Sequence, residues 1–202
     1  MQAATYAIPR HWREEWGIRR YGFHGLAVKS VAREVEAERL VVCHLGGGCS
    51  ITAVLDGRSV ETSMGFTPLE GVPMATRSGS VDPGALLYLL RERGVSSDEL
   101  DHALEHESGL LALGGSSDPR KLAGTAALEL YAYRIAATVG AMTVALGGLD
   151  ALAFTGGVGE GSSDVRARVV ERLSFLGAFD VVVVPAREEL VIAREVRRAL
   201  GG

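Results

Sequence analysis

Two glycine-rich segments each follow an apolar run with the composition of a buried strand. The first runs from His44 through Leu45 to Ser50, and its glycines are Gly46, Gly47 and Gly48. A turn without Cβ atoms lets backbone N–H groups approach phosphate oxygens. The alternative is a glycine hairpin without a ligand, since the turn matches neither the Walker A nor the GxGxxG pattern.

The second segment stands between a predicted strand and a predicted helix, and it comprises Gly156, Gly157, Val158, Gly159, Glu160 and Gly161. We predict a glycine loop, which in that position can pack against a nucleotide and direct a helix N-terminus at it. An ordinary strand-to-helix turn is the alternative. Two such segments in one sheet favour a nucleotide site.

Arg77 and His24 are candidates for chemistry at a phosphate. Arg77 lies in a loop predicted over 64–83, rich in Gly, Pro, Thr and Ser. A guanidinium there can neutralise charge on a transferring phosphoryl group; the alternative is a solvated or ion-paired arginine. His24 stands between Phe23 and Gly25, and a structural hydrogen bond is its alternative role.

Other charged residues fit a nucleotide and its metal. Asp118, Pro119 and Arg120 lie in a polar break between helices. Asp118 can accept a ribose hydroxyl, and Arg120 can stack on a base or bind phosphate; an N-cap for the next helix is the alternative. Glu188 opens the last predicted helix, where it either favours the helix dipole or binds magnesium.

The elements that must position these residues begin with an entry segment over 1–18, which includes a predicted helical turn at 11–16. A helix is predicted next, over 28–35. Three predicted strands cover 40–45, 50–55 and 58–63. Glycines join the first pair, and Asp56-Gly57 predicts a type I′ hairpin for the second. These strands form an antiparallel meander.

The rest of the chain alternates between helices and strands. Helices are predicted over 84–93, 98–107, 121–146, 163–175 and 188–200, and strands over 149–155 and 181–184. The helix over 121–146 is apolar nearly all round, which indicates a core or subunit interface. The strand over 181–184 is typical of one buried on both faces. Crossovers imply parallel pairing, so the fold class is α/β, a mixed sheet with helices on both faces.

Composition narrows the function classes. The 202 residues are 47% hydrophobic and 23% charged, with 26 glycines and a net charge of −4. That charge gives no electrostatic case for nucleic acid. Cys43 and Cys49 form no disulfide framework, which fits a cytoplasmic protein. The longest apolar run, 135–148, is shorter than a membrane span, so we expect no membrane partner.

Together these segments resemble the acetate and propionate kinase family. The matching stretches occur in family order: Arg19 to Gly25, His44 to Ser50, Thr62 to Gly71, Thr76 to Gly79, Asp82-Pro83, Ser108 to Leu111, Ser116 to Arg120, Phe154 to Glu160 and Glu188 to Leu190. The resemblance implies an actin-like ATPase fold built of ribonuclease-H-like domains. It also implies that ATP phosphorylates a short carboxylate, giving an acyl phosphate and ADP with Mg²⁺.

The resemblance assigns roles to particular residues. His24 and Arg77 match the transition-state stabilisers, and Glu188 matches a magnesium-binding glutamate. The nucleotide segments are matched by His44, Leu45, Gly46, Gly47 and Gly48, by Asp118, Pro119 and Arg120, and by Gly157, Val158, Gly159, Glu160 and Gly161. The family is also homodimeric through this half.

The sequence departs from the family pattern at three motifs and in extent. Gly47 replaces an asparagine, Leu26-Ala27-Val28 replaces three polar residues, and Gly161 replaces an asparagine. We expect residues 1–202 to be the C-terminal nucleotide-binding domain, with the N-terminal domain and its catalytic aspartate absent. Turnover then needs a separate N-terminal half, and the choice between acetate and propionate stays open. The alternative is an inactive ATP- or ADP-binding remnant or an interaction module.

Overall fold

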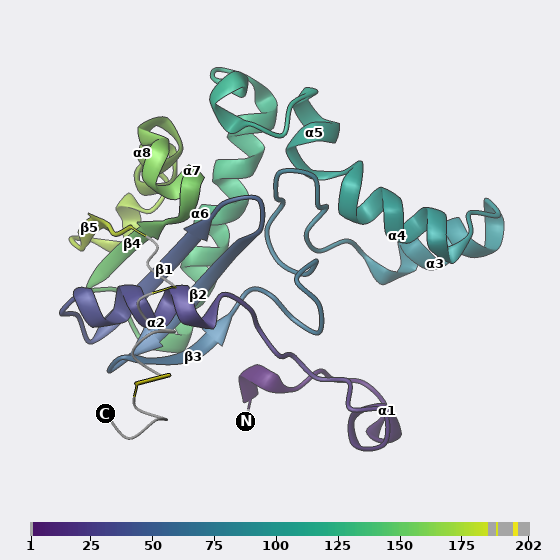
Figure 1. The fold of residues 1–202 in the computed structure, drawn as a ribbon, viewed down its shortest axis with the longest axis horizontal. Helices are drawn as coiled ribbons and strands as arrows, with labels where there is room; N and C mark the ends of the chain where they lie inside the picture. The colour runs from purple at the N-terminus through teal and green to yellow at the C-terminus, as the bar shows by residue number, and fades with distance from the viewer. Residues whose placement is uncertain (1, 186–188, 190–195, 198–202) are drawn as a thin grey trace.

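The computed structural model describes residues 2–185, 189, 196 and 197, and its centre is a five-stranded mixed sheet of order β3-β2-β1-β4-β5 (Figure 1). The strands are β1 (Arg39–Leu45), β2 (Cys49–Leu55), β3 (Arg58–Thr62), β4 (Ala151–Thr155) and β5 (Asp180–Val183). The predicted α/β class and mixed sheet are confirmed.

The predicted meander and crossovers are both present. β1 pairs antiparallel with β2, and β2 with β3. Asp56 and Gly57 have φ values of 48° and 73°, the left-handed pair that a type I′ turn requires. β4 pairs parallel with β1, and β5 parallel with β4. The β1 and β4 carboxyl ends therefore lie side by side, so the segments that follow them meet at one edge of the sheet.

Helices cover both faces of the sheet, as predicted (Figure 1). α6 (Ala126–Leu146) and α8 (Ser163–Glu171) pack on one face. α2 (Gly25–Glu34) packs on the other face, over a smaller apolar cluster. Side chains alternate along β1, so Val41, Cys43 and Leu45 enter the α6 cluster, whereas Leu40 and Val42 enter the α2 cluster. His44 falls on the α2 face.

The predicted loop over 64–83 contains no regular helix or strand up to residue 82, where α3 (Pro83–Glu92) follows. α3 and α4 (Ser97–His106) project from the body as an arm (Figure 1). The entry segment holds η1 (Gln2–Ala4) and α1 (Arg10–Glu14). It docks on the loop, because the Phe66 N–H donates to Tyr6 Oη at 3.0 Å. Just after the entry segment, the Tyr21 N–H donates to the Gly65 carbonyl of the same loop at 2.9 Å. The short helix α5 (Gly109–Gly114) was not predicted.

The long apolar helix begins later than predicted. Residues 119–122 form a separate 3₁₀ helix, η2 (Pro119–Leu122), and Gly124, with a φ of 74°, breaks the chain before α6. Thr125 caps α6 by accepting from the Leu128 N–H. The alternative role of residues 116–118 as a cap is therefore wrong for α6, because Asp118 caps η2 instead.

Two predictions for the last quarter of the chain need correction. β5 is a sheet edge rather than a strand buried on both faces, and Val181 and Val183 are 44% and 45% exposed. The helix over 163–175 ends at Glu171 and is followed by η3 (Ser174–Leu176). The helix predicted over 188–200 lies mostly outside the described residues. In the described chain, no helix combines the length and apolarity needed to cross a bilayer.

Candidate functional site

The first glycine segment closes the turn between β1 and β2. The Gly46 N–H donates to the Gly48 carbonyl at 3.1 Å, and Cys49 Sγ lies 3.5 Å from the Gly46 carbonyl. Cys49 Sγ is also 3.3 Å from the hydroxyl of Tyr131 on α6. This link anchors the turn to the core, while Gly47 at its tip is exposed.

His24 sits immediately before α2 and lies over this turn. Its φ of 61° is left-handed, a conformation uncommon for residues other than glycine and often found at functional sites. The His24 and His44 rings lie 4.1 Å apart between centroids, at an interplanar angle of 30°. His24 Nδ1 is 3.0 Å from Ser50 Oγ. Two strands and the start of a helix therefore fix one imidazole.

Arg77 comes from the 64–83 loop, and α4 and α5 hold it in place. Its Nε donates to Glu105 Oε2 at 2.6 Å. The loop backbone is bound to α5, since the Leu110 N–H donates to the Met74 carbonyl at 2.9 Å. Gly109 has a φ of 62°, and a Cβ there would stand 2.2 Å from the Met74 carbonyl oxygen. A glycine therefore permits the close approach that positions the arginine.

Arg77 and His24 converge at Gly48. A Cβ built on Gly48 would lie 3.4 Å from Arg77 Nη1 and 3.5 Å from His24 Nε2. One guanidinium and one imidazole thus meet beside a glycine turn at the carboxyl end of β1. Such a pair can donate hydrogen bonds to an anion at this point and neutralise charge that develops on it.

His44 extends the polar surface toward β4. Its Nδ1 is buried and has no hydrogen-bond partner in the described structure, and the same holds for Oγ1 of Thr155, its register partner on β4. Burial lowers the pKa of His44 below its ordinary value of 6.5, and the Glu160 carboxylate opposes that shift. His44 is therefore neutral at pH 7.

The lowered pKa of His44 predicts a stability change on acidification. The unfolded chain takes up this proton at a higher pH than the folded chain, so the free energy of unfolding falls as the pH drops below about 6.5. His44→Gln is expected to flatten this part of the profile. Urea denaturation of both proteins between pH 7.5 and 5 measures it. Identical slopes would show that His44 does not cause the loss.

The second glycine segment is a helix and not the predicted loop. α7 (Gly156–Gly161) follows β4 directly and packs against β1. Gly156 has a φ of 80°, and a Cβ on it would stand 2.7 Å from the Leu45 carbonyl oxygen. The Gly156 N–H donates to Glu160 Oε1 at 2.9 Å, which closes the helical turn. The structure therefore brings both glycine segments together at the β1 and β4 ends.

Asp118 caps η2 and Arg120 lies on it, ahead of α6. Their hydrogen bonds join them to each other, with Arg120 Nη2 donating to Asp118 Oδ2 at 2.8 Å, rather than to the histidines. That ion pair holds the pKa of Asp118 below its ordinary value. The Arg120 side chain is exposed and Pro119 is buried. Glu188, the predicted magnesium ligand, lies outside the described residues.

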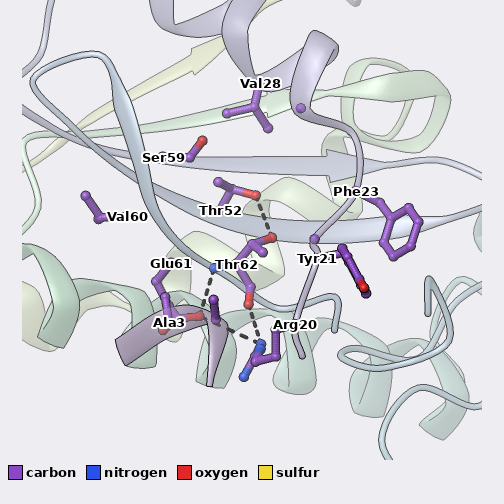
Figure 2. Close-up of a pocket in the computed structure, with 13 residues that line it drawn as sticks. Ala3, Arg20, Tyr21, Phe23, Val28, Thr52, Ser59, Val60, Glu61 and Thr62 are labelled. Carbon is purple, nitrogen blue, oxygen red and sulfur yellow. Dashed lines mark hydrogen bonds and ion pairs between the residues drawn. The ribbon is translucent and has the colours of Figure 1, made fainter. Parts of the chain in front are cut away.

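A pocket of about 250 Å³ opens on the α2 side of the sheet, next to His24 (Figure 2). Phe23 and Gly25, which flank His24, both line it. In Figure 2 the hydroxyls of Thr52 and Thr62 point toward one another, and their oxygens are 3.0 Å apart. The Arg20 guanidinium closes one side by donating to the Thr62 carbonyl at 2.5 Å.

Sequence reasoning did not single out Glu105 or Ser50. Glu105 is one of several acids on an exposed helix, so nothing in its local pattern marks it as the partner of Arg77. A signal for Ser50 did exist, because a tight turn between two strands places it opposite His44. Opposed residues of an antiparallel pair present their side chains on the same face.

Comparison with known proteins fits this geometry. A sequence model of the Acetokinase family matches residues 1–182. The chain belongs to this family. An acetate kinase of Protochlamydia amoebophila is 48% identical over 187 residues, which is 86% of this chain and 47% of the relative. The acetate kinase of Gloeobacter violaceus is 44% identical, over 96% of this chain and 57% of the relative.

Solved structures of the family share the fold. The acetate kinase of Porphyromonas gingivalis superposes with a TM-score of 0.92 at 34% identity, over 98% of this chain and 60% of that one. A propionate kinase of Francisella tularensis gives 0.91 at 36% identity, over 96% and 59%. The predicted actin-like fold is therefore confirmed. The chain spans about half the length of the curated relatives it matches.

Proposed function

We propose that this chain is the nucleotide-binding half of an enzyme that transfers a phosphoryl group from ATP to acetate or propionate, giving an acyl phosphate and ADP. The observation that carries this proposal is the convergence of Arg77 Nη1 and His24 Nε2 beside Gly48. In-line phosphoryl transfer depends on positioning and charge neutralisation, which two such donors supply. Family membership adds the reaction class.

The nucleotide is assigned to the segments around this point. His44 to Gly48 and Gly157 to Gly161 lie at neighbouring strand ends, where α/β sheets bind ligands. The unpartnered polar atoms of His44 and Thr155 suit a phosphate and its bound water. Asp118 and Arg120 are assigned to the adenosine, since both carry side-chain atoms that can bind a ribose hydroxyl or a base.

Mg²⁺ accompanies the nucleotide in this proposal, with Glu188 as its protein ligand. Within the described residues, no three His, Cys, Asp or Glu side chains cluster as a metal site would need. In this proposal one carboxylate and the nucleotide phosphates hold the ion, which is the usual mode of Mg²⁺ in phosphoryl-transfer enzymes. The ion would neutralise charge on those phosphates.

The carboxylate substrate and the second half of the cleft belong to the same proposal. Phe23 and the adjacent pocket supply one wall for a short acyl chain, and a separate N-terminal half supplies the other.

The homodimer expected from the resemblance is supported by exposed apolar side chains on α3, where Leu87 and Tyr88 are 45% and 47% exposed. The alternative of an inactive nucleotide-binding remnant shares the first step, which is binding.

Titration calorimetry with ADP and Mg²⁺ tests the proposal. We expect the 202-residue chain to bind ADP, and Asp118→Ala to weaken binding by about tenfold. Asp164→Ala removes an acid from a comparable exposed pair with Arg168, and it serves as the matched control. Equal affinity of the wild type and Asp118→Ala would contradict the adenosine assignment, and absence of binding would contradict the function.

Hydroxylamine trapping of the acyl phosphate separates the enzyme from the remnant. We expect little or no product from the chain alone, because a one-sided cleft does not orient the carboxylate. Product is expected when the N-terminal half of an acetate kinase is supplied as a separate chain. Binding without product in that mixture would favour the remnant.

A further inference from the structure

Ser50 lies behind His24, on the side away from Gly48. Ser50 and His44 are register partners at the β1 and β2 ends, so both side chains stand on the α2 face of the sheet. The His24 ring lies over this pair, with its centroid 4.1 Å from that of His44 and its Nδ1 3.0 Å from Ser50 Oγ. Ser50 is completely buried.

The edge of the His24 ring opposite Nδ1 faces the space beside Gly48, where the proposed phosphoryl transfer takes place. A Cβ on Gly48 would lie 3.4 Å from Arg77 Nη1 and 3.5 Å from both Cε1 and Nε2 of His24. Within the part of the chain that the structure describes, His44 from β1 and Arg77 from the 64–83 loop lie beside the His24 ring. A neutral imidazole carries a single ring proton, on either Nδ1 or Nε2. The position of that proton decides which ring nitrogen of His24 can donate a hydrogen bond.

We infer that Ser50 is a positioning residue for His24 in the proposed phosphoryl transfer, so this inference rests on the proposed function. The Ser50 hydroxyl donates to Nδ1, and the ring proton therefore sits on Nε2. The Nε2–H is thereby aimed at the space beside Gly48 and donates to a phosphoryl oxygen there. Ser50 acts through His24 and does not touch the substrate.

The chemistry of the anion selects this tautomer over the other. With the proton on Nδ1, His24 would donate to Ser50 and present the Nε2 lone pair to a negatively charged oxygen. That arrangement is repulsive, whereas an N–H donor beside a guanidinium stabilises the developing charge. Second-layer partners fix the tautomer of functional histidines in the same way at metal sites.

Nitrogen-15 NMR of the imidazoles in the full 202-residue chain tests this inference without any turnover. We expect wild-type His24 to show the Nε2–H tautomer, with Nδ1 as the acceptor nitrogen. Ser50→Ala should give a mixture of tautomers, and Ser50→Thr, which keeps a hydroxyl, should restore the wild-type pattern. The matched control is Thr52→Val, because Thr52 is buried on the same strand face and bonds Thr62 instead.

A wild-type spectrum with the proton on Nδ1 would overturn the inference whether or not any variant folds. An unchanged tautomer in Ser50→Ala would do the same. In the mixture with an acetate kinase N-terminal half, Ser50→Ala should lower kcat by about tenfold with ADP affinity unchanged. If the wild type did not bind ADP, that result would contradict the proposed function but not the inference about Ser50, because the tautomer is measured without nucleotide.

Discussion

Arg77→Ala is expected to lower the rate of acyl phosphate formation by about 10³-fold, in the mixture that contains an acetate kinase N-terminal half. Arg77 Nη1 is one of two donors beside Gly48, and its charge is the larger contribution there. The affinity for ADP should change far less, because the arginine acts chiefly on charge that develops during transfer. Hydroxylamine trapping gives the rate, and calorimetry gives the affinity.

Two further variants show how Arg77 acts. Arg77→Lys keeps the charge but loses the planar fork, so a substantial part of the loss should remain. Arg10→Ala removes an exposed arginine whose ion pair is with Glu14 on the same helix α1, and it should leave the rate unchanged. If Arg77→Ala kept its rate within about threefold, the arginine would be a structural partner of Glu105 and the proposed transfer chemistry would lose its main support.

The second large effect is on stability. Gly109→Ala is expected to lower the free energy of unfolding by about 3 kcal/mol. The new Cβ would meet the Met74 and Arg77 carbonyl oxygens at 2.2 and 2.7 Å, both of them backbone atoms that cannot turn aside. The left-handed φ of 62° adds strain of its own. Urea denaturation measures the change.

Gly115→Ala separates these two causes. Gly115 has a φ of 75°, but a Cβ there would meet nothing within 4 Å. Only the backbone strain remains, so the expected loss is about 1 kcal/mol. Equal losses for the two variants would mean that the loop has moved to accept the methyl group. In that case Gly109 would not be what holds Arg77 near Gly48.

Local patterns predicted the sheet well, because its signals are short in range. The glycines after β1 and the Asp56-Gly57 pair predicted the meander, and both strand partners were right. The predictions failed where tertiary contacts override local preference. Residues 156–161 look like a loop, yet Gly156 packs against the Leu45 carbonyl and the segment closes into a helix.

Exposure was harder to predict than secondary structure. The valines of β5 have the composition of a strand buried on both faces, but they lie at the sheet edge. The composition of a strand shows that its side chains are suited to burial, but it does not show whether a further strand or helix covers them. The alternative role of Asp118 as a cap for α6 is wrong, because Gly124 separates the two and Thr125 is the cap.

The sequence alone determined the fold class, the family and the identity of the candidate residues, because these depend on residue types, their order and their local spacing. Only the tertiary structure decided that His24 and Arg77 meet beside Gly48, that Glu105 holds the arginine, and that Ser50 stands behind the histidine. These contacts join residues far apart in the chain. They exist because sheet register and loop docking fix positions that no local pattern encodes.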